Sequence, residues 1–422
     1  MRPDLTERLR AEIARSPLAR GRESHVGVEH EFQVIDGGEQ VDFRSVIHGL
    51  GLGTRHLDPL DADAYRLRNG SVLTCDGLEA EIAIPPEPMR AGFPDRAVQR
   101  VDIAACHLRE LLPDAWELRG HSTHISVSVP TDLVDRVARD VVATVTPALL
   151  LLTSARDTPG LMVRPRPHRV ELGLGFVPAA WLPAAVTFAA GCVLHLTRQA
   201  ASTAQAISRL QLDVVAADHR YGWYVDRRAA GHDVNELGRR TPVEQAGGAR
   251  VSAQDVLATT WTAVRPDLEG VAGAHALAAV DDVVDGRRPI RLESPSWEPP
   301  GTPDHALPPS PFGSMLATRE RDGFDVAPVM AAWDVSVFVV ASRARRRRLF
   351  ACVPRDDLAS FLERLDAGAL DRLLRAALRR GCGDTRLDSV AKASRVGLFA
   401  SLGTRGALLA PQVAPRYTPT AP

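Results

Sequence analysis

The sequence predicts an α+β fold, and three observations indicate it. Several short segments alternate apolar and polar residues with a period of two, which is typical of strands. Others carry apolar stripes at helical spacing. These two kinds of segment follow one another without the regular β-α-β spacing of a doubly wound sheet. With 422 residues, 45% of them hydrophobic and 24% charged, the chain has the composition of a soluble globular protein of one to three domains.

The strands and helices can be placed in order from these patterns. We expect strands at Val26 to Val34, Ser71 to Ile84, His121 to Val129, Arg169 to Phe176, Val335 to Ala341 and Leu349 to Val353. We expect helices at Asp4 to Ala14, Asp95 to Leu112, Leu133 to Ser154, Leu182 to Leu212 and Asp356 to Leu378. The Leu182 helix is very apolar, so we expect it to be mostly buried.

A proline-rich stretch divides the chain. Seven prolines fall between Glu293 and Phe312, which excludes a regular helix or a central strand there. We therefore predict a first domain at residues 1–290, an extended linker at 291–314 and a C-terminal α+β region of unknown role at 315–422. The arginines at 345–348 are interpreted as a solvated loop, with an anionic partner as the weaker alternative.

Charge and cysteine usage narrow the class of protein. A net charge of -1 gives no general attraction to nucleic acid or to anionic lipid, so we expect neither as a partner. The five cysteines form no C-x-x-C pair, which favours reduced thiols in a cytoplasmic protein. The first twenty residues lack the apolar core of a secretory signal, and the run from Val177 to Leu196 is better explained as a buried helix than as a membrane span.

The segment from His25 to Asp36 carries two carboxylates on one face of a predicted strand. Alternation places Glu29 and Glu31 on the face opposite Val28. A solvated acidic face would explain this strand taken alone. Two like charges so close together also suit a bound cation.

Three further strands repeat the arrangement. Glu79 and Glu81 share a face of the second strand, Ser122 and His124 share a face of the third, and Arg169 and Glu171 share a face of the fourth with Gly173. The same alternation directs His121 toward the core. Together the four strands could form one sheet whose polar face binds Mg²⁺ and phosphate. No G-x-x-x-x-G-K-S/T loop is present, which excludes a P-loop ATPase.

These segments resemble a known family. Gly27-Val-Glu-His-Glu-Phe32, Glu81-Ile-Ala-Ile-Pro-Pro86, Gly120-His-Ser-Thr-His124 and Arg169-Val-Glu171 occur in the order and near the spacing found in the glutamate-cysteine ligase type 2 family, carboxylate-amine ligases related to glutamine synthetase. Trp223-Tyr-Val-Asp-Arg227 resembles that family's W-x-A-x-R segment, with Val225 in the place of alanine. The resemblance covers roughly residues 24 to 290.

The resemblance implies a fold, a reaction and a set of site residues. It implies a curved antiparallel sheet forming a half-funnel with helices outside. It also implies ATP with Mg²⁺ or Mn²⁺, and an amide bond made through an acyl phosphate from a small-molecule carboxylic acid and an amine. By resemblance the metal ligands are Glu29, Glu31, Glu81 and Glu171, with Glu79 or Asp76 as helpers. Arg169 and Arg227 are the implied catalytic residues, which contact phosphate or a substrate carboxylate. The implied cofactor contacts are made by Arg164 and Arg166, in a loop before Arg169, and by His124 and Ser122.

Two positions depart from the family pattern. Ser122 stands where the family has the first histidine of G-x-H-x-H, and His121 could replace that histidine only if a β-bulge reorients the strand. Gly173 stands where the family has the second arginine of R-x-E-x-R, which argues against glutamate and cysteine as substrates.

Three functions remain open at this stage: a ligase with changed substrates, a non-catalytic relative that binds a nucleotide, a small acid or a protein partner, and a guanidino kinase-like phosphotransferase. Homo-oligomers are compatible with all three.

Overall fold

The computed structural model describes residues 24–52, 63–67, 70–155, 158–166, 168–201, 210–211, 214–216, 222–293, 318–331, 333, 335–344, 348–380 and 399–400. The predicted helix at Asp4 to Ala14 lies outside them, as do residues 294–317 of the proline-rich stretch and residues 345–347 of the arginine run.

The centre of the fold is one large sheet of eleven strands in the order β11-β12-β8-β9-β7-β1-β5-β4-β3, with β2 and β6 also paired to β1. Its central pairs are antiparallel. The strands are β1 (His25–Asp36), β2 (Glu39–Val41), β3 (Tyr65–Arg66), β4 (Val72–Asp76), β5 (Glu79–Ala83), β6 (Glu87–Pro88), β7 (Glu117–Ser128), β8 (Gly160–Arg166), β9 (Arg169–Gly175), β11 (Val214–Ala216) and β12 (Trp223–Asp226). A mixed fold with a large antiparallel sheet confirms the α+β class.

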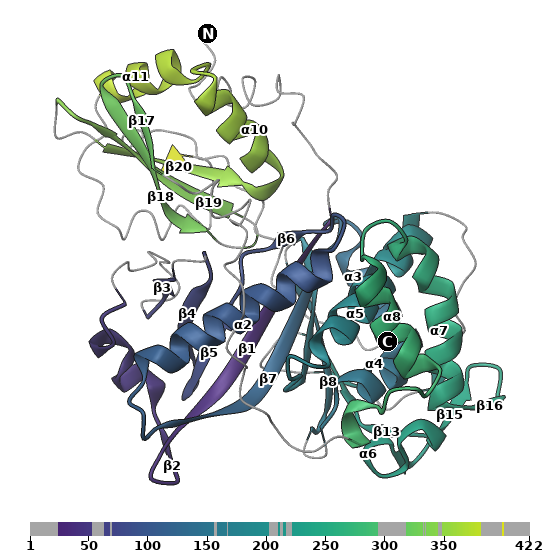
Figure 1. Cartoon of the computed structure of the whole chain (residues 1–422). Coiled ribbons are helices and arrows are strands. Elements are labelled where there is room, and N and C mark those ends of the chain that lie inside the picture. Colours follow the sequence, from purple (N-terminus) through teal and green to yellow (C-terminus); the bar gives the residue numbers. More distant parts are fainter. Residues whose placement is uncertain are drawn as a thin grey trace. The chain divides into compact units, whose positions relative to one another are not determined.

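Helices cover the apolar face of this sheet (Figure 1). They are α2 (Phe93–Leu111), α3 (Val134–Thr144), α4 (Thr146–Thr153), α5 (Leu182–Ala201), α7 (Ala253–Leu268) and α8 (Ala274–Val284). Val28 of β1, Ile125 of β7 and Leu172 of β9 are fully buried in one core with these helices, which include the apolar helix α5. The opposite face of the same strands is left for polar side chains.

Proline and capping residues set the helix boundaries. The predicted helix from Leu133 to Ser154 is divided between α3 and α4, because Pro147 has no N–H to donate and its ring disfavours a continuous helix. Pro94 lies in the first turn of α2, where a missing N–H costs nothing. Ser252 and Asp255 form a capping box at the start of α7.

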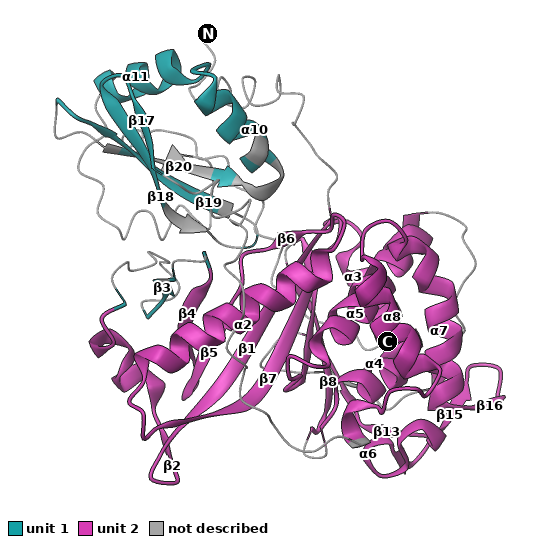
Figure 2. Cartoon of the chain, in the orientation of Figure 1, with its two compact units in different colours: residues 1–23, 52–70, 308–416 teal, residues 24–51, 71–307, 417–422 magenta. Residues whose placement is uncertain are grey.

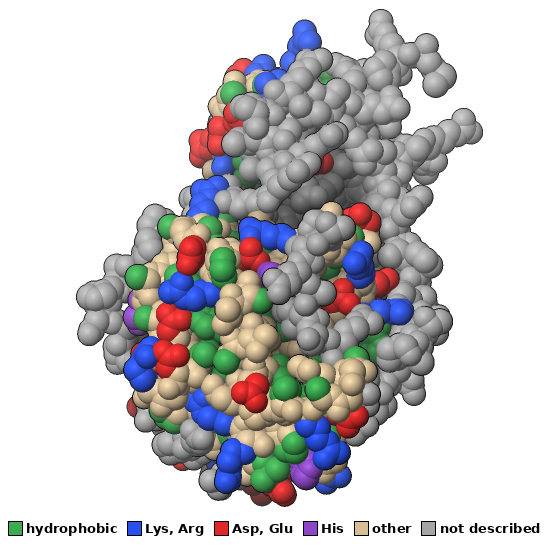
Figure 3. Space-filling view, turned by 90° about the vertical axis from the view of Figure 1, so that its right-hand side faces the viewer, with side chains coloured by type: hydrophobic (Ala, Val, Ile, Leu, Met, Phe, Trp, Pro, Cys, Tyr) green, Lys and Arg blue, Asp and Glu red, His purple; other side chains and the backbone are tan. Residues whose placement is uncertain are grey.

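Short elements complete this part of the chain. They are a sheet of β10 (Leu210–Gln211), β15 (Pro242–Gln245) and β16 (Arg250–Ser252), the pair β13 (Arg228–Ala229) and β14 (His232–Asp233), helix α6 (Val234–Leu237), and the 3₁₀ turns η1 (Phe43–Ser45), η2 (Ile47–Gly49), η3 (Gly238–Arg240) and η4 (Arg291–Glu293). On the side shown in Figure 3, positive and negative side chains are interspersed, as expected for a solvent-facing surface.

The chain divides into two compact units, residues 24–51, 71–307 and 417–422 in one and residues 1–23, 52–70 and 308–416 in the other (Figure 2). The second unit contains a sheet of β17 (Arg319–Arg321), β18 (Phe324–Ala331), β19 (Val335–Ser342), β20 (Arg348–Pro354) and β21 (Phe399–Ala400), with helices α10 (Arg355–Asp366) and α11 (Asp371–Arg380). The predicted pairing of residues 335–341 with 349–353 is confirmed. The predicted helix at 356–378 is interrupted, and Gly368 adopts a φ of 72° in the break.

None of the helices in the described part of the chain is both long and apolar enough to cross a membrane. The apolar run from Val177 to Leu196 contributes most of α5, whose residues pack in the core as predicted. The domain boundaries at 290 and 314 stay predictions.

Candidate functional site

Strand β1 presents its carboxylates on the face predicted for them. Val28 and Phe32 are buried in the core, whereas Glu29 and Glu31 point to the opposite face of the sheet. His30 packs in the core against Phe32 and Phe176, and burial, with His124 nearby, lowers the pKa of His30 to about 3. His30 is therefore neutral and structural.

Three carboxylates from neighbouring strands converge beside β1. Glu31 is directly opposite Glu81 of β5, and Asp76 lies at the end of β4, the strand that pairs with β5. One oxygen from each of Glu31, Asp76 and Glu81 lies within 4.8 Å of the others. We call these three residues the acidic cluster. Glu31 and Glu81 were predicted as metal ligands, and Asp76 was predicted as a helper.

The acidic cluster gathers three carboxylates with little positive charge beside them. Burial raises the pKa of Glu81 well above its usual range, and the charges of Glu29, Glu31, Asp76 and Glu171 raise it further. Burial also raises the pKa of Glu31, against the opposing effects of His124 and Ser122. The buried Oε1 of Glu31 accepts no hydrogen bond from any described residue. These carboxylates therefore suit a divalent cation.

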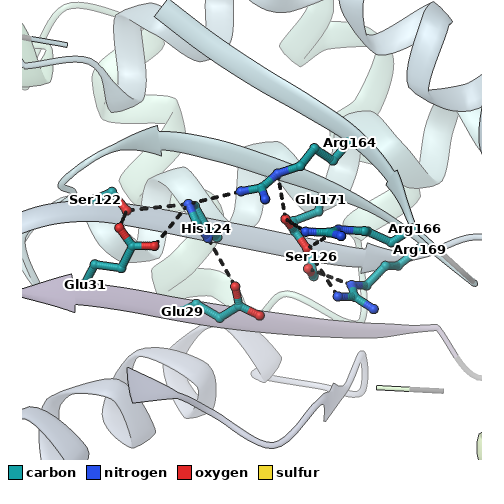
Figure 4. Close-up of polar contacts among 9 residues, drawn as sticks. All are labelled: Glu29, Glu31, Ser122, His124, Ser126, Arg164, Arg166, Arg169 and Glu171. Carbon is teal, nitrogen blue, oxygen red and sulfur yellow. Dashed lines mark hydrogen bonds and ion pairs between the residues drawn. The ribbon is translucent and has the colours of Figure 1, made fainter. Parts of the chain in front are cut away.

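His124 links the two carboxylates of β1 (Figure 4). Its Nδ1–H donates to Glu29 Oε2 at 3.2 Å, and its Nε2 lies 3.6 Å from Glu31 Oε1. Burial alone would lower the pKa of His124, but the hydrogen bond to Glu29 and the charges of Glu29, Glu31 and Glu171 outweigh it and raise the pKa. His124 thus lies on the polar face, as predicted.

The neighbouring histidine lies on the opposite side from the one predicted. The register between β1 and β7 shifts after Glu31, because Ser122 faces Glu31 while Gly120 faces the next residue, Phe32. This irregularity leaves His121 as an extra residue, and it is exposed, with its Nε2 4.0 Å from Glu79 Oε1. Thr123, two residues before the core residue Ile125, lies on the core side and is fully buried. The prediction of a core His121 is wrong, for the reason that a bulge resets the alternation.

Ser122 contacts a carboxylate of the acidic cluster. Its hydroxyl donates to Glu31 Oε2 at 2.5 Å and lies 3.5 Å from His124 Nε2. Ser122 therefore supports Glu31 from the position where the family pattern has a histidine.

Four charged residues form a second group on the same face. Arg164 Nε lies 2.9 Å from Glu171 Oε1, Arg166 Nε lies 3.3 Å from Oε2, and Arg169 Nη2 lies 3.2 Å from Oε2. We call Arg164, Arg166, Arg169 and Glu171 the arginine cluster (Figure 4). Burial alone would raise the pKa of Glu171, but the three arginines lower it to about 2.

The arginine cluster depends on a strand that the sequence patterns did not reveal. Arg164 and Arg166 were expected in a loop, yet both lie in β8, which pairs with β9 so that Arg164 faces Glu171. Period-two spacing then aims Arg164 and Arg166 to the same side. Pro165 and Pro167 mask this strand in the sequence, although Arg-x-Arg was the available signal.

Gly173 lies between the two clusters. A Cβ at this position would be 3.2 Å from Met162 Cβ and 3.4 Å from His124 Cδ2. The place of the family's second arginine is thus already lined by Met162 and His124, and Arg164 Nη2 lies 3.5 Å from His124 Nε2.

Arg227 is not brought into either cluster. It follows β12, where its Nε lies 2.9 Å from Asp233 Oδ2 and its Nη1 donates to the carbonyl of Thr158. Glu79 accepts from Gln40 Nε2 at 2.9 Å. The roles predicted for Arg227 and for the other site residues remain predictions.

Comparisons with known proteins find similarities that cover part of the chain. No family model matches the chain. A reducing polyketide synthase, grgA, of Penicillium sp is 36% identical over 86 residues, which cover 19% of this chain and 4% of that protein. Among solved structures, the complex between the prokaryotic ubiquitin-like protein Pup and its ligase PafA is similar with a TM-score of 0.41 and 12% identity, over 63% of this chain and 64% of that one. This chain therefore spans less than two thirds of either protein, and membership of the glutamate-cysteine ligase type 2 family stays a prediction.

Proposed function

We propose that the chain is an ATP-dependent carboxylate-amine ligase that forms an amide bond. One observation carries the proposal: a single sheet face holds carboxylates with little counter-charge beside arginines that carry an excess of it. A magnesium-bound polyphosphate has the matching pattern, with a cation at one place and phosphate oxygens at the next. The order of the sequence motifs supports the same reaction class.

The acidic cluster would hold Mg²⁺ or Mn²⁺ through Glu31, Asp76 and Glu81, with Glu29 beside them. When bound, the cation would neutralise charge on the transferring phosphoryl group. His124 and Ser122 would keep Glu29 and Glu31 in position through the hydrogen bonds at 3.2 Å and 2.5 Å. Such outer contacts tune metal sites in many proteins.

The arginine cluster would hold the anionic partner in the reaction. A guanidinium pairs with phosphate or carboxylate oxygens through two parallel N–H groups. Arg164, Arg166 and Arg169 would thereby orient the γ-phosphate of ATP or the substrate carboxylate.

The reaction proceeds in two balanced steps. The γ-phosphoryl group moves from ATP to the substrate carboxylate, which leaves ADP and an acyl phosphate. The amine then attacks the acyl carbon, phosphate departs with the C–O bonding electrons, and the amine loses a proton. Gly173 supplies no second arginine, which supports a small carboxylic acid other than glutamate and an amine other than cysteine.

We also propose that residues 1–290 form the catalytic region, with the large sheet as a half-funnel. The net charge of -1 and the unpaired pattern of the cysteines support a cytoplasmic protein without nucleic acid or membrane as a partner.

Product analysis tests the proposal. The full chain is incubated with ATP, Mg²⁺, a panel of carboxylic acids and a panel of amines, and ADP is measured. A ligase releases ADP in amounts that require both an acid and an amine, with an amide of matching mass. ADP release that needs neither substrate, or only a guanidino compound, would contradict it.

A second candidate is a non-catalytic relative, and one observation favours it. The hydroxyl of Ser122 already occupies Glu31 Oε2, which leaves fewer open oxygens for a metal than a histidine neighbour would. In that case, calorimetry should detect weak or Mg²⁺-independent ATP binding and no ADP across the panel. Ordinary Mg²⁺-dependent binding would remove this alternative.

A further inference from the structure

We infer that Glu171 is a positioning residue that organises Arg164, Arg166 and Arg169 into an anion-binding site, and that it is not a ligand of the metal. The inference deepens the proposed function and relies on it only for the identity of the anion. It also changes the role that the sequence resemblance implies for Glu171.

The contacts of Glu171 are the first observation. Both oxygens are engaged by arginines, Oε1 by Arg164 and Oε2 by Arg166 and Arg169, at 2.9 to 3.3 Å. Its side chain is 3% exposed. A carboxylate so enclosed by positive charge would have to release its guanidinium partners before it could bind a cation, and those same guanidiniums would repel the cation.

The acidic cluster provides the contrast. Glu31, Asp76 and Glu81 place their oxygens within 4.8 Å of one another, and Glu171 is not in that group. The Oε1 of Glu31 accepts no hydrogen bond from the described residues. A cation would therefore meet three carboxylates with one histidine near them at one end of the face, and a carboxylate enclosed by three arginines at the other.

The arginine cluster carries more donors than Glu171 can use. Each guanidinium offers five N–H groups, whereas one carboxylate accepts about four hydrogen bonds. Arg169 also donates to Ser126 Oγ at 3.2 Å, and Arg164 reaches His124. With three positive charges and one negative charge, the cluster retains two positive charges in excess. A dianion such as a phosphate group matches that excess better than a monoanion does.

The positions of the arginines show why Glu171 is needed. Arg164 and Arg166 come from β8 and Arg169 from β9, so three like charges share one side of two paired strands. Their mutual repulsion would spread them apart without a central carboxylate. Glutamate reaches all three from Cα, whereas aspartate, one methylene shorter, keeps the charge but loses the reach.

Binding measurements on the full chain test this without turnover. Calorimetry with Mn²⁺ alone gives metal affinity, and calorimetry with inorganic phosphate and with acetate gives anion affinity. For Glu171→Asp we expect Mn²⁺ affinity within about twofold of the wild type and phosphate affinity reduced about tenfold, as for loss of one charged hydrogen bond. The matched variant Glu81→Gln should reverse the pattern, with Mn²⁺ affinity reduced about tenfold or more and phosphate affinity retained.

Arg166→Gln provides a second variant, because Arg166 is the most exposed of the three arginines, with a side chain 34% exposed. It should lower phosphate affinity about tenfold and leave Mn²⁺ binding unchanged.

Stronger binding of phosphate than of acetate identifies a phosphate site, and the reverse identifies a carboxylate site. The inference would be overturned if Glu171→Asp lowered the Mn²⁺ affinity as much as Glu81→Gln does. It would also be overturned if neither Glu171→Asp nor Arg166→Gln changed the phosphate affinity. An inactive chain that still shows these binding patterns would refute the ligase reaction alone.

Discussion

The acidic cluster and the arginine cluster lie on one sheet face, yet Glu81 of the first and Glu171 of the second behave in opposite ways. Burial disfavours the charged form of both Glu81 and Glu171. Neighbouring carboxylates raise the pKa of Glu81 further, while three arginines lower the pKa of Glu171 to about 2. The difference teaches that the charges surrounding a carboxylate, rather than its burial, decide which ligand it suits.

This contrast also separates the two functions that the proposed reaction requires, which are metal binding and anion binding. The acidic cluster supplies oxygen ligands with little counter-charge, and the arginine cluster supplies donors in excess. His124 lies between them, with its Nε2 3.6 Å from Glu31 Oε1 and 3.5 Å from Arg164 Nη2. A ligand with a cation beside an anionic group can satisfy both clusters together.

The largest expected effect is at the acidic cluster. Glu31→Gln and Glu81→Gln should lower ATP-dependent amide formation by about three orders of magnitude or more, because each removes a charged metal ligand. Folding should persist, and the metal-free melting temperature should rise slightly as a like charge is removed. Activity assays and thermal melts with and without Mg²⁺ measure both effects.

Glu117→Gln, an exposed change at the start of β7, is the matched control and should leave activity and Mg²⁺ response unchanged. Full activity in Glu31→Gln, or unfolding of both cluster variants, would show that these carboxylates do not form a metal site.

The next largest effect separates the histidines. His124→Ala should lower activity about 10- to 100-fold, because Glu29 and Glu31 lose the side chain that orients them. His121→Ala should change stability by less than about 0.5 kcal/mol, since His121 is exposed. Thermal melts and kinetics on both variants check this. Substantial destabilisation by His121→Ala would instead support a strand without the bulge, in which His121 faces the core.

The arginine cluster should respond through stability. The folded pKa of Glu171 is about 2, below its ordinary value of 4.5, so its charged form stabilises the fold above about pH 4.5, and this stabilisation is lost as pH falls toward 2. Glu171→Gln should therefore cost about 2 kcal/mol at pH 7, by leaving three arginines without their shared carboxylate. Urea unfolding at pH 7 and pH 3 should show that cost shrinking in acid.

A cost for Glu171→Gln that stays constant between pH 7 and pH 3 would mean that packing, rather than charge, fixes Glu171. A stabilisation at pH 7 would make Glu171 resemble Glu81 and would remove the contrast between the clusters.

Sequence patterns predicted the face of the sheet on which a side chain lies better than the residues that it contacts there. Period-two alternation placed Glu29, Glu31 and His124 correctly, because a regular strand fixes the direction of each side chain. It failed at His121, where one extra residue resets the register, since nothing local in Gly120-His-Ser announces a bulge.

Local sequence patterns could not predict the arginine cluster, for a different reason. Pairing of β8 with β9 is a tertiary event, and it brings Arg164 opposite Glu171. The sequence indicated a carboxylate near arginines without showing that three of them share it. Likewise Asp76 was only a helper until the pairing of β4 with β5 placed it beside Glu81.

The smallest expected effect is at Asp102, where burial is the cause of a raised carboxyl pKa. Asp102 on α2 is partly buried, and burial raises its pKa from 3.8 to about 6. A raised carboxyl pKa makes the charged form costly above about pH 6, and this cost disappears as pH falls toward 4. Asp102→Asn should therefore stabilise the protein by about 1 kcal/mol at pH 7, less than the full shift implies because water still reaches the group. Urea unfolding at pH 7.5 and pH 4 measures the difference, which should vanish in acid. If Asp102→Asn destabilises the fold at pH 7.5, burial alone does not control this carboxyl.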